Sequence, residues 1–135
     1  MNLDDYLPYM RDVVRCEASL RELNLMWRVI EAMAEMNCGD DANGLLPMIA
    51  ATRQGFERLE RDLIDNLVNT VKGYAQHEQQ VLTQVTEARS KVGQIQVNAE
   101  DAQSLAQFQQ AQGELGGALQ RLMVVSENYP QLKAD

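Results

Sequence analysis

The stretch VVRCEASLRELNLMWRVIEAMA, residues 13–34, decides the fold. Its apolar residues recur at steps of three and four, a heptad rhythm typical of helices that pack side by side. The two adjoining lines of this seam are Tyr6, Val13, Leu20, Trp27 and Ala34, and Tyr9, Cys16, Leu23 and Ile30. The pattern predicts a first helix over about residues 4–37, with Asp4 as its N-cap and Gly39 as its C-cap.

A second helix is predicted from Asn43 to about Val92, because no proline or Gly-Asp turn interrupts the later part of this segment. Its seam contains two successive steps of four between Leu63 and Val71, which form a stutter. A third helix is predicted over about residues 98–128. The sequence therefore predicts an all-α fold, an antiparallel bundle of three long helices with coiled-coil-like packing.

Helices of these lengths cannot cover one another completely. The first would lie against about residues 44–78 of the second and the third against about residues 65–95. The uncovered seam would stay in water, at a cost of about 25 cal/mol per Å². Either two chains associate into a four-helix bundle, or the second helix breaks near residues 62–74 and folds back. We expect association, because that segment contains no turn signal.

Ten apolar side chains are expected to carry this packing, within the chain and between chains. The expected partner is a second copy in a homodimer, with another protein as the alternative. The packing and association seam consists of Leu20, Leu23, Trp27, Ile30, Phe56, Leu63, Val81, Val85, Leu115 and Leu122.

Composition excludes several partners. The chain has 12 basic and 20 acidic residues, a net charge of −8, and residues 1–58 and 59–135 carry the same balance of charges. Without a Lys- or Arg-rich patch, the chain is poorly suited to binding a phosphate backbone, so we expect no nucleic-acid partner. No run of 18 apolar residues is present, and Met1–Asp5 does not start a signal peptide, so we expect no membrane span in this chain.

The two cysteines bear on the compartment. Cys16 and Cys38 are 22 residues apart on the predicted first helix, which is about 33 Å at 1.5 Å per residue. A disulfide needs Cα atoms within about 7 Å of each other, so these two cannot pair within the chain. Unpaired cysteines and the lack of a signal peptide favour the cytoplasm.

No residue pattern predicts catalysis or cofactor binding. His77 is the only histidine, whereas a metal site of the ferritin type needs Glu-x-x-His elements from several helices. Cys38 stands beside Asp40 and Asp41, an acidic setting that disfavours a thiolate. We therefore expect a protein that is not an enzyme and binds no metal or cofactor.

Several short runs follow one another in the second half: Asp62–Ile64, Asn66–Glu78, Val85–Arg89, Ala118–Leu122 and Glu127–Ala134. In this order, residues 61–135 resemble the LemA family. The resemblance implies a bacterial protein whose long-helix bundle lies outside the cytoplasm behind a transmembrane segment, and which is not known as an enzyme. This chain departs from the family pattern at Asp65, where proline is usual. No membrane segment precedes the resemblance, and the chain ends at Asp135, where family members continue into another helix.

Residues 1–58 carry no such resemblance, so the first half is either divergent or a fused, unrelated hairpin. We expect a single bundle made of an N-terminal hairpin, residues 1–61, and a LemA-like hairpin, residues 62–135. The expected function is a self-associating scaffold or protein-interaction module. The alternative is a signalling or sensory module in which the stutter near Leu63–Val71 switches between two states.

Overall fold

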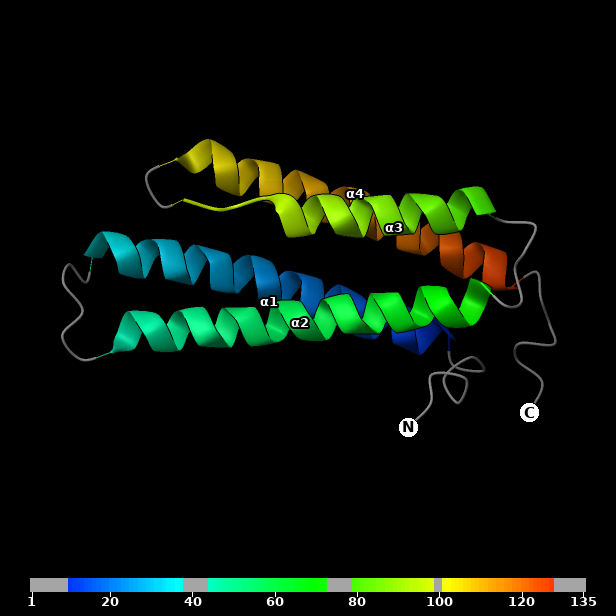
Figure 1. Cartoon of the computed structure of the whole chain (residues 1–135), viewed down its shortest axis with the longest axis horizontal. Helices are drawn as coiled ribbons and strands as arrows, with labels where there is room; N and C mark the ends of the chain where they lie inside the picture. Colours follow the sequence, from blue (N-terminus) through cyan, green and yellow to red (C-terminus); the bar gives the residue numbers. More distant parts are fainter. Residues whose placement is uncertain (1–9, 38–43, 73–78, 99–100, 128–135) are drawn as a thin grey trace.

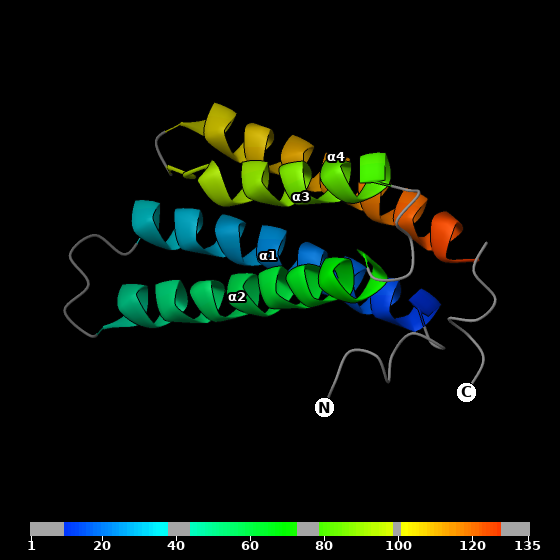
Figure 2. The same ribbon diagram turned by 45° about the vertical axis from the view of Figure 1, so that its right-hand side comes forward.

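The computed structural model describes residues 10–37, 44–72, 79–98 and 101–127. Its helices are α1 (Met10–Asn37), α2 (Leu45–Lys72), α3 (Gln79–Gln94) and α4 (Ala102–Glu127). α1 and α2 form one antiparallel hairpin and α3 and α4 the other, with α4 beside α1 and α3 beside α2 (Figures 1 and 2). The predicted all-α class is confirmed. The architecture is an up-and-down bundle of four helices rather than three.

The prediction of one continuous helix from Asn43 to about Val92 is wrong. α2 ends at Lys72, and α3 starts at Gln79 and runs back along it (Figure 1). Residues 73–78 between them lie outside the described residues, and the sequence begins this interval with a glycine, a poor helix former. Folding back covers the seam within one chain, without the entropy cost of bringing two chains together. The structure therefore follows the alternative prediction, in which the second helix breaks near residues 62–74 and folds back.

The apolar core lies at the end of the bundle where α1 begins and α4 ends. Val71 of α2, Val85 of α3, and Leu119 and Leu122 of α4 have no exposed surface, and Val14 of α1 is almost as well buried. Burying a side chain of this size contributes roughly 1.5–3 kcal/mol, so this cluster holds the two hairpins together. Both its position and its composition follow from the heptad spacing of these residues.

Hydrogen bonds before its first turn fix the start of α4. Asp101 Oδ1 accepts a hydrogen bond from the backbone N–H of Gln103 at 3.0 Å, as an N-cap side chain does. Ser104 Oγ accepts one from the backbone N–H of Asn98 at 2.9 Å and donates one to the carbonyl oxygen of Asp101 at 2.6 Å. The third predicted helix therefore begins a few residues later than residue 98.

The expected boundary between the two hairpins at residues 61 and 62 falls within α2, which runs unbroken from Leu45 to Lys72. The stutter Leu63–Val71 also lies inside this helix. Across the described ranges, none of the four helices combines the length and apolar character needed to cross a membrane.

Candidate functional site

The predicted seam of the second hairpin lies in the core. Val85, Leu115 and Leu122 are fully buried, and Val81 packs against the same cluster. Leu63 of α2 also contacts it from a half-buried position. In this part of the chain, apolar spacing identified the residues that face the bundle.

The seam predicted on α1 is buried in the core at Val13, but most of its later residues are not. Cys16 is exposed, Ile30 is 38% exposed, and Leu20 and Leu23 are only half-buried. The predicted line through Cys16 and Ile30 is therefore not a core line. Trp27 is also half-buried, and its ring stacks on that of Phe56 of α2 with centroids 6.3 Å apart. The apolar line thus borders the contact between α1 and α2, while another side of α1 points into the bundle.

The buried side of α1 beyond its first turns is polar. Glu17 and Asn24 are 1% and 0% exposed. They belong to a stripe at steps of four and three that also contains Arg21, Arg28 and Glu31. Neighbours at these steps share one helix face. Such a stripe is usually solvated, but here it lies inside the bundle.

Four buried polar side chains form a layer between α1, α2 and α4. Glu60 Oε1 accepts hydrogen bonds from Asn24 Nδ2 at 2.6 Å and from Gln112 Nε2 at 3.3 Å. Glu17 lies against the Glu60 carboxylate from α1. These four side chains, Glu17, Asn24, Glu60 and Gln112, are called the polar layer below. The members that pair lie far apart in the sequence, so their pairing cannot be seen in it. Sequence analysis missed all of them.

The pKa of Glu17 is raised to about 9, first by burial and then by its hydrogen bond with Glu60 and by the charge of Glu60, although the charge of Arg21 opposes this rise. At neutral pH Glu17 therefore keeps its proton. The proton on Glu17 supplies the donor for its hydrogen bond with the neighbouring Glu60 side chain.

Arg21 of α1 lies against the backbone of α4. Its Nη1 is 3.3 Å from Glu17 Oε1. A Cβ added at Gly116 would stand 2.6 Å from Arg21 Cζ, far inside van der Waals contact. Gly116 therefore provides the room in which the guanidinium sits. The glycine thus allows the Arg21 side chain to approach the backbone of α4 closely.

Ion pairs continue from the polar layer towards the end of the first hairpin where α1 ends and α2 begins. Arg28 Nε is 2.8 Å from Glu57 Oε1, and Arg53 Nε is 2.8 Å from Glu31 Oε1. The Arg28 guanidinium also lies over the ring of Phe108 in α4, 5.0 Å from its centroid. Partly buried ion pairs add little to the free energy of unfolding, because the cost of removing both charges from water offsets their attraction. We therefore expect these contacts to align the helices more than to stabilise them.

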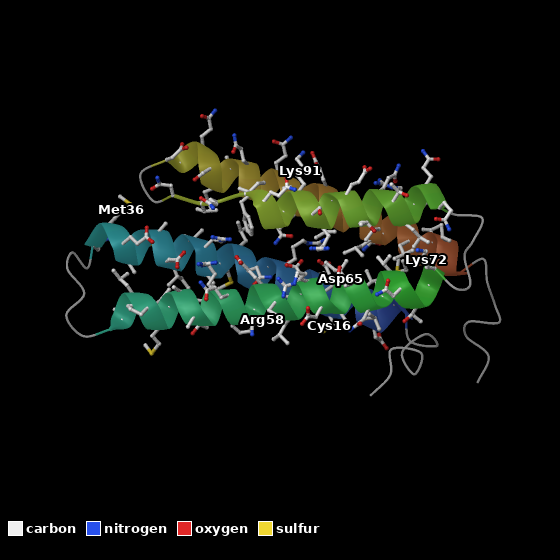
Figure 3. All side chains as sticks on the ribbon, viewed as in Figure 1. Cys16, Met36, Arg58, Asp65, Lys72 and Lys91 are labelled. Carbon is white, nitrogen blue, oxygen red and sulfur yellow. The ribbon has the colours of Figure 1, made fainter. Side chains whose placement is uncertain are left out.

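One further pair joins the two hairpins. Asp65 points from α2 towards α3 (Figure 3), where Arg89 Nε lies 3.0 Å from its Oδ1.

Burial lowers the pKa of Arg28 from its ordinary value, an effect that the charge of Glu57 opposes. The polar half of the bundle thus pairs most of its charges internally.

Apolar side chains cover the solvent side of the first hairpin instead. Met26 and Ile30 stand two positions from Asn24 and Arg28, which places them on the opposite side of α1. Asn24 pairs with Glu60, so Met26 is level with Leu59 of α2. The residues of this surface, called the outer face below, are Met26 (56% exposed), Ile30 (38%), Met33 (58%), Leu45 (40%), Met48 (60%) and Leu59 (57%).

His77 and Cys38 lie outside the described residues. Within the described residues, no three His, Cys, Asp or Glu side chains gather in a way that could hold a metal ion. The polar layer consists of buried side chains that pack between helices, and it contains Glu17, whose pKa is raised.

These features define an antiparallel four-helix bundle with an apolar core at one end, a polar layer towards the other, and an apolar surface on its first hairpin. A family model described as the LemA family matches residues 56–135, more than half of the chain. The chain therefore belongs to the LemA family, and the resemblance seen from residue 61 is confirmed. The match begins at Phe56 and so includes the second half of α2, α3 and α4. Comparisons with curated proteins and with solved structures give no significant match.

Proposed function

We propose that this protein is a self-associating interaction module, in which two copies pair through the outer face. The observation that carries the proposal is the orientation of α1 about its own axis. Its polar residues Glu17 and Asn24 are buried, whereas the apolar residues Met26, Ile30 and Met33 are exposed. Large exposed apolar side chains that are continuous along a surface are typical of protein interaction sites. Methionine side chains suit such a surface because they are flexible and polarisable.

A second copy fits this surface better than a membrane or a polar ligand. The outer face runs along two antiparallel helices, so a twofold axis lying in the plane of this face would place the apolar surfaces of two copies against each other. Two such hairpins facing each other would form a further four-helix layer, through a surface that shares only Ile30 with the predicted association seam. Charges oppose it, because each chain carries −8. Added salt should therefore strengthen the dimer by screening this repulsion.

Light scattering after size exclusion tests the proposal. The parent protein should have twice the 15.2 kDa chain mass at micromolar concentration. The double variant Ile30→Glu, Leu59→Glu should be monomeric yet melt at a similar temperature, because both positions are exposed. Val124→Glu is the matched control, since Val124 is 56% exposed on α4, outside the outer face. A monomeric parent at all concentrations and salt levels would refute the proposal.

A sensory role is the second candidate, and one observation favours it. Ile64, which follows the first residue of the stutter, lines a cleft between the two hairpins. A ligand in that cleft would contact the segment whose helical register is irregular. A ligand-dependent change in the spacing between α2 and α3, measured with paired spin labels at the exposed Asn69 and Thr83, would support this role.

A further inference from the structure

A cleft of about 290 Å³ lies between the two hairpins in the polar half of the bundle, and all four helices line it. Its walls carry the cations Arg28, Arg58, Arg61 and Arg89 and the anions Glu57 and Glu60. The cleft is therefore cationic in a chain whose net charge is −8. Its volume lies near the lower end of the range for small-molecule sites, which begins at about 300 Å³.

The two carboxylates of the cleft already have partners. Glu57 is paired with Arg28 at 2.8 Å and with Arg53 at 3.2 Å. Glu60 accepts the amide hydrogen bonds of the polar layer. Neither glutamate is therefore free to neutralise a second arginine.

The charges of two arginines in the cleft are not neutralised by a strong ion pair with the described residues. Arg58 makes no hydrogen bond or ion pair with the described residues. Arg61 has only Asp62, its neighbour in the chain, at 3.6 Å, and both of these side chains are more than half exposed. Such an exposed pair is worth little. Because guanidinium groups match carboxylates and phosphates in geometry, these two arginines form an anion-binding edge.

One wall of the cleft is apolar. Phe108 (1% exposed), Ile64 (1%) and Leu115 (1%) line it, and Val92 of α3 completes this wall. Gly93 also lines it, and a Cβ added there would meet no atom within 4 Å. Gly93 leaves open space next to this apolar wall. Arg58 and Arg61 line the cleft from α2.

We propose that this cleft binds a small organic anion, with an apolar or aromatic body against Ile64, Leu115 and Phe108 and a carboxylate or phosphate at Arg58 and Arg61. The proposal does not depend on dimerisation. The outer face and the cleft lie on different sides of α2, because Leu59 and Arg61 are two positions apart on that helix.

An NMR titration with 1-naphthyl phosphate tests the proposal. Methyl signals of Ile64, Val92 and Leu115 should shift saturably. Sodium 1-naphthoate should act on the same methyls and shows whether a carboxylate replaces the phosphate. The neutral 1-naphthalenemethanol should bind at least tenfold more weakly, and inorganic phosphate alone should cause no saturable shift of these methyls.

Variants locate the binding. Arg58→Gln, Arg61→Gln should weaken 1-naphthyl phosphate binding at least tenfold while leaving binding of the neutral alcohol unchanged. Gly93→Leu should fill the cleft and abolish binding of both. Gly113→Leu is its matched control, because Gly113 also has open space around its added Cβ but does not line the cleft. Unfolding curves of all variants confirm that each is folded.

Four results would overturn the proposal. The first is no saturable binding of either anionic probe by the folded parent. The second is equal binding of anionic and neutral probes. The third is binding that survives Gly93→Leu. The fourth is a set of shifts confined to the methionine methyls of the outer face, which would place the probe on that apolar surface instead.

Discussion

The guanidinium of Arg21 on α1 fills the space that a side chain at Gly116 of α4 would need. This contact ties the two hairpins together beside the polar layer, and it explains a glycine in the middle of a helix, where glycine costs about 1 kcal/mol relative to alanine. It also makes the effect of a substitution at residue 116 depend on a residue far away in the sequence.

A double-mutant cycle measures this dependence. Gly113→Ala should raise the free energy of unfolding by about 1 kcal/mol, because the position has open space. Gly116→Ala should give none of this gain, or a net loss, since the new methyl group displaces Arg21 from Glu17. In an Arg21→Ala background, Gly116→Ala should recover the gain. Chemical denaturation measures all four stabilities, and an equal effect of Gly116→Ala in both backgrounds would show that the two residues are not coupled.

The raised pKa of Glu17 predicts how the free energy of unfolding changes with pH. The folded pKa of Glu17 is raised from 4.5 to about 9, so between these values the folded state binds a proton that the unfolded state has released. The stabilisation is complete below pH 4.5 and is lost as pH rises towards 9. From this group alone, the free energy of unfolding should fall by at most about 1.4 kcal/mol per pH unit.

Glu17→Gln tests this assignment, because the amide can donate to Glu60 at every pH. The variant should match the parent near pH 5 and exceed its stability near pH 9, as measured by urea denaturation. Glu22→Gln, an exposed position on the same helix, should keep the slope of the parent. If Glu17→Gln also keeps that slope, Glu17 is not the titrating group.

Truncations distinguish core from surface leucines. Leu119 has no exposed surface, whereas Leu59 is 57% exposed. Leu119→Ala should lower the free energy of unfolding by roughly 2–5 kcal/mol through loss of burial and formation of a cavity. Leu59→Ala should change the stability of the monomer by no more than about 0.5 kcal/mol. Thermal and urea unfolding at a concentration below the dimer range measure both, and similar losses would mean that the core has been misplaced.

The second hairpin could be predicted from the sequence because its apolar residues at heptad spacing are also the ones that face the bundle. Val85, Leu115 and Leu122 occupy such positions and are fully buried. The break between α2 and α3 could not be predicted in the same way. Periodicity reports only that each segment is helical, and whether a long helix folds back depends on how much surface the returning part can cover.

The first helix was harder because two stripes compete on it. The apolar stripe through Leu23 and Ile30 and the polar stripe through Glu17 and Asn24 have the same spacing, so periodicity alone cannot decide which one faces inward. The deciding signal is the complementary stripe on α2, where Arg53 and Glu60 meet Glu31 and Asn24. That signal becomes visible only when the two helices are aligned antiparallel. The cleft was missed for the same reason, because its residues come from four helices.

The division of the bundle into an apolar and a polar half predicts uneven local stability. Val71 and Val85 lie in an interior without polar partners, whereas the opposite half depends on hydrogen bonds and ion pairs around Asn24 and Glu60. Partly buried ion pairs add little net stability, so the polar half should open without unfolding of the rest. Native-state hydrogen exchange should therefore show lower opening free energies for amides of residues 24–36 than for those of residues 64–71.

The double variant Asn24→Leu, Glu60→Leu should narrow this difference in opening free energy by replacing the buried hydrogen-bonded pair with apolar contacts. Uniform opening energies along α1 and α2 in the parent would show that the polar half is as cooperative as the core.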